Sequence, residues 1–596
     1  MNPTDTADLD SPELRARAVA AARGDAPFDL LIAGGTVVDV VTGRCRAADI
    51  GCTGPLIASV HPAGSRTDAA ETLSAAGAFV APGLIDTHMH VESSLVTPAV
   101  YAGAVVPRGT TTSVWDPHEF GNVCGVDGVR WAVDAAAGLP LRLLVLAPSC
   151  VPAAPGLERA GADFDAETIA EILAMPGIVG LAEVMNMRGV IDNDARMRAI
   201  VDTALASGKL VRGHARGLSG AGLQAFAAAG VGSDHELVSG EDLLAKLEAG
   251  FTIELRGSHR HLLPEFAQTL AALGHIPQTV TLCTDDVFPD DLARRGGVDE
   301  VLRELVRAGL PAEAVLRAAT LNAAYAIGRP DLGLLAPGRR ADIAVFEDLA
   351  TFTARAVVAN GRLVAAEGAL VAPIPENDAG PLTGTMHLAP LAEAAFTIPA
   401  DGPRAEIATI DSPRFTKWGR REAAVEGGRI VPPEGTALIA VAHRHGLADG
   451  TPRVGVLDGW GVWRGAFATT VSHDSHNLTV FGGNPRDMAA AANAVIEAGG
   501  GMAVAAGGVV TAVLPLPLGG LVSPAPLAEV AAGFRAVREA ADAVADWEPP
   551  YRVFKACFGA TLACNAGPHQ TDLGIADVET GKVLESPVLA TYPHAA

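Results

Sequence analysis

The stretch Pro82-Gly-Leu-Ile-Asp-Thr-His-Met-His90 decides the fold of this chain. It is a short apolar run that ends in two histidines, His88 and His90. In a strand, residues i and i+2 point to the same face, so the two imidazoles can bind one metal ion. A single His-x-His pair is a weak signal, because such pairs also occur on surfaces and in cores. It indicates a metal site only if neighbouring strands also end in metal ligands.

Outward from this stretch, short apolar runs alternate with helical stretches, which is typical of a parallel sheet. The eight runs are 83–86, 112–115, 142–146, 178–182, 210–213, 231–233, 251–255 and 281–283. Their spacing of roughly 20 to 36 residues fits the strand–helix repeats of a (β/α)8 barrel. The sequence therefore predicts an α/β fold with a TIM barrel over residues 83–335. An open doubly wound sheet is less favoured, because polar residues from most of the strand ends would have to converge.

The sequence pattern on both flanks of the predicted barrel differs from the strand–helix alternation of the barrel itself. Short strands separated by Gly-rich turns occupy 28–82 and return at 336–375, which predicts one small β-sandwich domain split between the flanks. Residues 1–27 read as an N-terminal helical extension, because Ser11-Pro12-Glu13 is a helix-start pattern. A Pro-rich linker is expected at 376–404, followed by a separate C-terminal α+β domain over 405–596.

Four further polar residues fall at the ends of predicted strands, where barrel enzymes keep their active sites. Glu183 ends the fourth run, His214 the fifth, His235 the sixth and Asp285 the eighth. Imidazole and carboxylate ligands without thiolate suit Mn or Fe, and Zn is also compatible. Together with His88 and His90 they exceed what one ion with an open position uses. We therefore expect two divalent ions per chain.

Other polar clusters are candidates for proton transfer or substrate binding. Asp116, His118 and Glu119 follow the second run and are predicted to carry protons or contact substrate, the alternative being turn chemistry. Glu92, Ser93 and Ser94 could hydrogen-bond a substrate, and a helix cap is nearly as well supported. In the C-terminal region, we expect a structural or lid role, in preference to a second metal or ligand site, for the cluster of His473, Asp474 and His476. The same ambiguity holds for His443, His445 and His569, whereas the remaining histidines, including His61, His259, His261 and His275, are expected to be exposed or packed.

Charge and composition exclude several partner classes. The formal net charge of -24 would repel nucleic-acid phosphates and anionic lipid, so polymeric nucleic acid and membranes are not expected partners. Met1 to Asp10 is polar and acidic, unlike a secretory signal. The 7 cysteines form no C-x-x-C pair and are expected to be reduced. These features predict a cytoplasmic protein; the sequence carries no signature of oligomeric state, and a homo-oligomer is compatible with it.

Several motifs together resemble the adenine deaminase family of the amidohydrolase superfamily, from about residue 28 to the end. They are His90-Val-Glu-Ser-Ser, Asp116-Pro-His-Glu, Ala182-Glu-Val-Met-Asn, Gly213-His-Ala, Ser233-Asp-His-Glu, Thr284-Asp-Asp, Ser472-His-Asp-Ser-His-Asn, Gly499-Gly-Gly-Met and Leu514-Pro-Leu-Pro-Leu. Hydantoinase-like relatives bridge their metals with a strand-four lysine, but this chain has Glu183 there. Mononuclear deaminases carry His-x-x-Glu on strand five, but Gly217 follows His214 at i+3.

The resemblance implies a role for each candidate ligand. His88, His90 and Asp285 would hold one ion, His214 and His235 the other, and Glu183 would bridge the two. Hydroxide would attack C6 of the purine base adenine, and Asp285 would move the proton, so that water is consumed and hypoxanthine and ammonia are released. The alternatives are a binuclear amidohydrolase acting on another cyclic amidine or amide, and an inactive scaffold relative.

Overall fold

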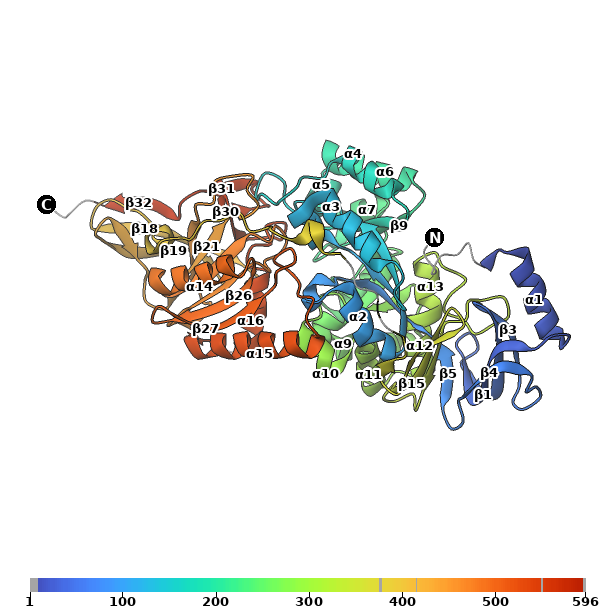
Figure 1. The fold of residues 1–596 in the computed structure, drawn as a ribbon. Helices are drawn as coiled ribbons and strands as arrows, with labels where there is room; N and C mark the ends of the chain where they lie inside the picture. The colour runs from blue at the N-terminus through green and yellow to red at the C-terminus, as the bar shows by residue number, and fades with distance from the viewer. Residues whose placement is uncertain (1–8, 373, 375–377, 414, 548–549, 593–596) are drawn as a thin grey trace.

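The central domain of the computed structural model lies between the two end domains (Figure 1). It contains eight parallel strands. Five form one sheet in the order β10-β9-β8-β7-β6, and three form a second sheet in the order β11-β12-β13. Their bounds are β6 Leu84–Met89, β7 Thr110–Trp115, β8 Arg142–Ala147, β9 Ile178–Val184, β10 Leu210–Gly213, β11 Ser233–Asp234, β12 Thr252–Arg256 and β13 Val280–Cys283. Each of the eight predicted runs overlaps one of these strands. The structure describes residues 9–372, 374, 378–413, 415–547 and 550–592.

The two parallel sheets adjoin at both ends, but backbone hydrogen bonds do not close them into one ladder among the described residues. Between β10 and β11, the Gly213 amide donates to the Ser233 side chain at 3.1 Å. At the other end, the Asp285 amide donates to the His88 carbonyl at 3.0 Å, and Met89 and Asp285 form an isolated bridge. The predicted closed barrel is thus observed as a five-stranded half-barrel with a three-stranded sheet beside it. One of the two interruptions falls at β11, which is only two residues long and follows the Gly-Val-Gly stretch 230–232.

Helices separate successive strands and supply much of the apolar core. They include α2 Pro98–Val105, α3 His118–Ala136, α4 Ala166–Ala174, α6 Ala195–Ala206, α7 Gly220–Ala228, α8 Gly240–Glu248, α9 Leu263–Leu273, α11 Val298–Arg307 and α12 Ala312–Arg317. α11 illustrates the pattern, because it buries Val298, Val301, Leu302 and Leu305. This spacing of three and four residues places one apolar stripe against the strands.

The two flanks of the central domain build one small β domain. Strands β1 Phe28–Asp39, β2 Arg44–Thr53, β3 Leu56–Pro62, β4 Ala69–Ser74 and β5 Phe79–Pro82 join β14 Ile343–Phe346, β15 Ala354–Ala359, β16 Arg362–Ala366 and β17 Ala369–Leu370. They form a single nine-stranded sheet instead of the two separate sheets of the predicted sandwich. The reason is β5, which pairs with β1 on one edge and with β14 on the other. Helix α1 (Pro12–Arg23), capped by Ser11, precedes this sheet.

The C-terminal domain has a ten-stranded sheet with helices α14 Pro485–Glu497, α15 Leu527–Val544 and α16 Pro550–Phe558. Its strands are β18 Arg404–Asp411, β19 Lys417–Glu426, β20 Arg429–Val431, β21 Thr436–Ala442, β22 Arg453–Asp458, β24 Ala466–Thr469, β25 Leu478–Gly482, β26 Gly501–Ala506, β27 Val509–Pro515 and β32 Val588–Tyr592. The preceding stretch contains two short 3-10 helices, Gly380–Leu382 and Glu393–Phe396. Residues 376 and 377 of the predicted linker, together with residues 1–8 and 593–596, lie outside the described residues.

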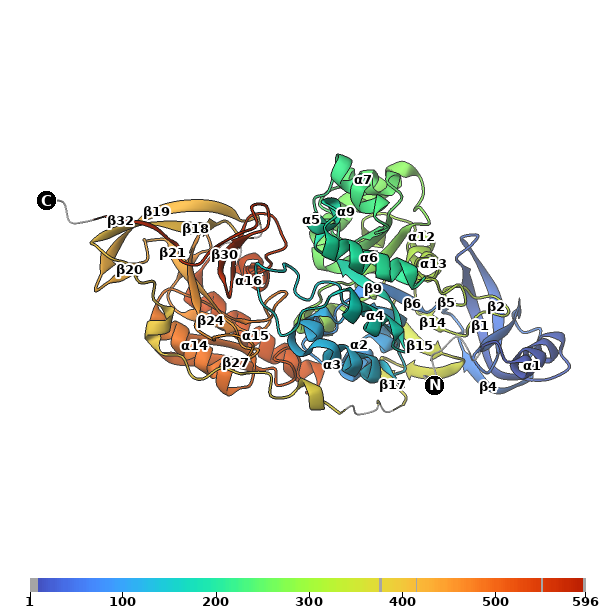
Figure 2. The ribbon, with the colours of Figure 1, turned by 90° about the horizontal axis from the view of Figure 1, so that it is seen from above.

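The C-terminal domain packs against the central domain, on the side away from the small β domain (Figures 1 and 2). The ring of Phe288 lies 5.1 Å from that of Phe534 and 5.2 Å from that of Phe558. Arg159 Nε donates to Asp572 Oδ2 at 2.8 Å. These apolar and charged contacts place C-terminal loops over the ends of the central strands. No helix among the described residues is long and apolar enough to cross a membrane.

Candidate active site

The six residues predicted as metal ligands lie together in the central domain, all of them buried. His88 and Glu183 lie within β6 and β9. His90, His214 and His235 directly follow β6, β10 and β11, and Asp285 lies two residues after the end of β13. Parallel strands end on the same edge of a sheet, which brings residues from distant parts of the chain into one cluster. The structure therefore brings together every predicted ligand.

Glu183 lies at the centre of this cluster, with one carboxylate oxygen toward each pair of histidines. Its Oε1 is 3.8 Å from His88 Nε2 and 3.4 Å from His90 Nε2. Its Oε2 is 2.6 Å from His214 Nδ1 and 3.2 Å from His235 Nε2. A carboxylate with this arrangement has one oxygen available to each of two cations.

Charges around Glu183 favour its ionised form. Burial alone would raise the pKa of this carboxyl, but the charge of His235 and hydrogen bonds from His214, His235 and His90 hold it well below its usual range. His88 Nε2 is buried and has no hydrogen-bond partner among the described residues. An anionic carboxylate beside an unpartnered imidazole nitrogen suits a divalent cation, and the donor set contains only nitrogen and oxygen. The residues present therefore fit the predicted metal site.

Asp285 completes the cluster and is fixed by residues that the sequence reading did not single out. Its Oδ1 lies 3.7 Å from His88 Nε2 and 3.4 Å from His90 Nε2. Its Oδ2 accepts hydrogen bonds from Arg256 Nη1 and, at 2.9 Å, from Ser258 Oγ. Arg256 is the last residue of β12 and also pairs with Glu236 at 2.7 Å. Its position at a strand end was the signal that could have identified it.

The predicted proton carriers stand beside the cluster. His118 Nδ1 is 3.1 Å from Asp116 Oδ2 and 3.7 Å from Glu183 Oε1. The Asp116 carbonyl lies 3.0 Å from His90 Nδ1, which orients that imidazole. Glu119 is buried, and burial raises the pKa of its carboxyl. Asp116, His118 and Glu119 thus lie next to the predicted ligands, and their part in proton transfer stays a prediction.

The predicted substrate contacts bind protein groups in this structure. Glu92 accepts from the Trp115 indole at 2.8 Å, and Ser94 donates to the Val91 carbonyl at 2.5 Å. Ser93 donates to Asp286 Oδ1 at 2.5 Å. None of the three is among the described residues that line the cavity. Substrate binding by Glu92, Ser93 and Ser94 stays a prediction.

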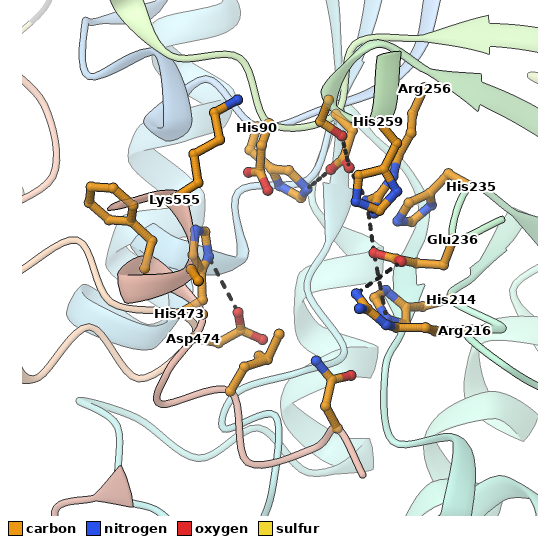
Figure 3. Close-up of a pocket in the computed structure, with 18 of the residues that line it drawn as sticks. His90, His214, Arg216, His235, Glu236, Arg256, His259, His473, Asp474 and Lys555 are labelled. Carbon is orange, nitrogen blue, oxygen red and sulfur yellow. Dashed lines mark hydrogen bonds and ion pairs between the residues drawn. The ribbon is translucent and has the colours of Figure 1, made fainter. Parts of the chain in front are cut away.

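A cavity of about 360 Å³ opens onto the cluster and is lined by both domains. His90, Glu183, His214, His235 and Asp285 line it from the central domain. The C-terminal domain adds polar, aromatic and cationic groups, namely Trp460, His473, Asp474, Lys555, Phe558, Asn565 and His569. Figure 3 shows His473 and Asp474 across the cavity from His214 and Arg216. A small molecule in this cavity can therefore contact both domains at once.

The remaining histidines are divided between cavity, core and surface. His259 and His261 line the cavity, which sequence reasoning did not anticipate. His61 stacks on Phe28, with ring centroids 5.6 Å apart, and His275 is exposed. His476 and His445 hold the loop that precedes β25: the His476 Nδ1 accepts from the Ser472 amide at 3.2 Å, and His445 Nε2 lies 2.8 Å from the Ser475 carbonyl. His443 is buried outside the cavity lining.

Comparison with known proteins identifies both parts of the chain. The amidohydrolase family model matches residues 79–364, and the adenine deaminase C-terminal domain model matches residues 413–582. "Adenine deaminase 2" of Rhizobium meliloti (strain 1021) is 71% identical over 98% of this chain and 99% of its own length. "Adenine deaminase 2" of Rhizobium etli is 66% identical over 98% of each chain. "Adenine deaminase" of Klebsiella pneumoniae (strain 342) is 51% identical over 97% of this chain and 96% of its own length. The chain therefore belongs to the adenine deaminase family, within the amidohydrolases.

Proposed function

We propose that this chain catalyses the hydrolytic deamination of adenine to hypoxanthine and ammonia. The observation that carries the proposal is Glu183, whose two carboxylate oxygens face separate histidine pairs on the wall of a cavity that can take a small heterocycle. The 71% identity to a curated adenine deaminase over almost the whole chain supports the same reaction. In this reaction a bond forms between water oxygen and C6 of adenine, and the bond from C6 to the exocyclic nitrogen breaks.

The proposed cofactor is a pair of divalent ions, with Mn or Fe favoured and Zn compatible. His88, His90 and Asp285 would hold one ion, His214 and His235 the other, and Glu183 would contact both. When bound, two such ions lower the pKa of water enough for hydroxide to form near neutral pH. In this proposal the two parallel sheets together form one (β/α)8 barrel, which presents all six ligands at the same end.

Proton movements are assigned to residues of this chain. Asp285 would accept the proton of the attacking water and pass it toward a ring nitrogen or the departing amine. Arg256 and Ser258 fix the carboxylate of Asp285 for this transfer. His118, oriented by Asp116, and Glu119 would carry protons on the side where the amine leaves. Adenine and water are thus the small-molecule partners of the reaction.

The decisive experiment measures ammonia release by Mn-loaded protein from adenine, adenosine, guanine and cytosine. We expect release from adenine with formation of hypoxanthine. The Glu183→Gln variant serves as the matched control, because it keeps the shape of the side chain and loses its charge. If the protein releases ammonia from another of these compounds and none from adenine, the proposal is wrong and that compound is the substrate.

A further inference from the structure

The C-terminal domain supplies two side chains to the cavity that contains the predicted metal ligands. His473 and Asp474 lie in the loop between β24 and β25. Both line the same cavity as His90, Glu183 and His235 (Figure 3). The side chain of Asp474 is fully buried, and that of His473 retains 16% exposure. The loop is therefore part of the cavity wall.

Backbone contacts hold His473 in place. Its amide donates to the Phe558 carbonyl at 2.9 Å, and its carbonyl accepts from Thr561 Oγ1 at 2.6 Å. Phe558 packs on Phe288 of the central domain. The position of His473 relative to the central domain is thus set by the packing between the two domains.

One ring nitrogen of His473 faces carboxylates from both domains. Its Nδ1 lies 3.5 Å from Asp474 Oδ1 and 3.7 Å from Glu119 Oε1. Asp474 Oδ1 is also 3.7 Å from His118 Nε2, so the two imidazoles share this carboxylate. Because Asp474 and Glu119 both face Nδ1 of this cavity-lining side chain, the remaining ring nitrogen is Nε2. It is the nitrogen left to contact a ligand.

The charges that face His473 favour a donor at both ring nitrogens. Burial alone would lower the pKa of this imidazole, but hydrogen bonding to Asp474 and the charges of Asp286 and Glu119 raise it to about 9. Adenine has unsubstituted ring nitrogens, which are hydrogen-bond acceptors. An imidazole N–H whose second nitrogen is held by a carboxylate is a matching, oriented donor.

We propose that His473 is a substrate-binding residue whose Nε2–H donates a hydrogen bond to a ring nitrogen of the purine, with Asp474 as the positioning residue behind it. The inference rests on the proposed deamination of adenine and adds a residue from the second domain to that site. The C-terminal domain is then a part of the active site, and the central domain alone lacks one substrate contact.

The test combines a variant of His473 with purine analogues. Adenine KM and the inhibition constants of 1-deaza-, 3-deaza- and 7-deazaadenine are measured for the wild type and His473→Ala, each loaded with Mn. We expect a KM for adenine about 10- to 100-fold higher in the variant, because one hydrogen bond to a charged group is lost. One analogue, in which C–H replaces the contacted nitrogen, should bind the wild type more weakly than the other two and lose no further affinity in the variant.

The matched control is His443→Ala, which removes a buried imidazole of the same domain outside the cavity lining. It should keep the adenine KM, and metal content and thermal midpoint are compared for both variants. If the adenine KM of His473→Ala is within twofold of the wild-type value, this inference is wrong and the proposed deamination of adenine is unaffected. An equal loss of affinity for adenine and all three analogues also overturns it, because the contact is then not with a ring nitrogen. A wild type that releases no ammonia from adenine overturns the proposed function and this inference together.

Discussion

The backbone amide of Asp285 donates a hydrogen bond to the carbonyl of His88, with 3.0 Å between nitrogen and oxygen. This bond joins a predicted ligand on the first strand of the central domain to one that follows its last strand. Asp285 also has a φ of 56°, a left-handed backbone conformation that is uncommon for residues other than glycine. Such a conformation persists when the surroundings hold it, and it is frequent at functional sites. The carboxylate of Asp285 is therefore held both by its backbone and by Arg256.

Replacing Asp285 with Asn should reduce kcat about 10²- to 10⁴-fold while adenine KM changes only a few-fold. The reason is that a proton-transferring group acts mainly in the transition state. Steady-state kinetics of ammonia release, with metal content measured on the same sample, checks this. A variant that keeps most of its kcat and shows a raised KM would make Asp285 a binding residue instead.

Replacing Glu183 with Gln should lower the occupancy of at least one metal ion and reduce activity by several orders of magnitude. Loss of the negative charge between two cations leaves their mutual repulsion uncompensated. The metal-free variant should still unfold in a cooperative thermal transition, because strand β9 buries several apolar side chains besides Glu183. Elemental analysis that finds two ions and near-normal activity in this variant would rule out Glu183 as the bridge.

Removal of divalent metal should abolish activity, and restoration should require about two ions per chain. The protein is treated with a chelator, dialysed and titrated with Mn²⁺, Fe²⁺ or Zn²⁺, and ammonia release is followed at each step. Mg²⁺ is the control, because the histidine-rich donor set suits it poorly. Full activity at one bound ion per chain would contradict the binuclear assignment.

Glu158 predicts a pH dependence of stability. Burial, together with the charge of Asp474, raises the pKa of this carboxyl to about 8. Its protonated form is therefore favoured in the folded state, and the wild type should lose stability as pH rises from about 4.5 toward 8. Glu158→Gln should remove this loss, on the order of a few kcal/mol, and raise the thermal midpoint at pH 8 but not at pH 5.

The control for this measurement is Glu167→Gln, which removes one negative charge from an exposed position in helix α4. It should shift the midpoint little at either pH. If Glu158→Gln has the same thermal midpoint as the wild type at pH 8, the prediction is wrong. Ionisation of Glu158 then costs the folded protein no stability.

The cluster of predicted metal ligands could be located from the sequence because its members lie at or near the ends of the apolar runs. His214 and Asp285 are polar residues at the ends of apolar runs, and parallel strands bring such ends together whatever their separation in the chain. The contribution of His473 could not be located this way. It lies in a different domain, and the packing of Phe288 against Phe558, which no periodicity encodes, decides where its loop falls.

The sheet pairings were also only partly predictable. β5 and β14 are short apolar runs in the sequence, and such runs do not reveal that β5 hydrogen-bonds on both edges. The single nine-stranded sheet follows from that double pairing. In the same way, the predicted apolar run 231–233 shares only Ser233 with β11, because an apolar run alone does not define where backbone pairing begins.

The pairing of β5 with β14 also bears on how the chain is made. During synthesis, β1 to β5 leave the ribosome first, and β5 then has one edge without its partner until β14 has been translated. Long-range pairing of this kind is slow to form, and an open strand edge is a site of aggregation. The central domain is in this respect an insertion within a sheet, and its early folding would shorten the search by which β14 finds β5. Ribosome-stalled chains ending at residue 335 should therefore be cleaved by protease in residues 28–82 more readily than the finished protein.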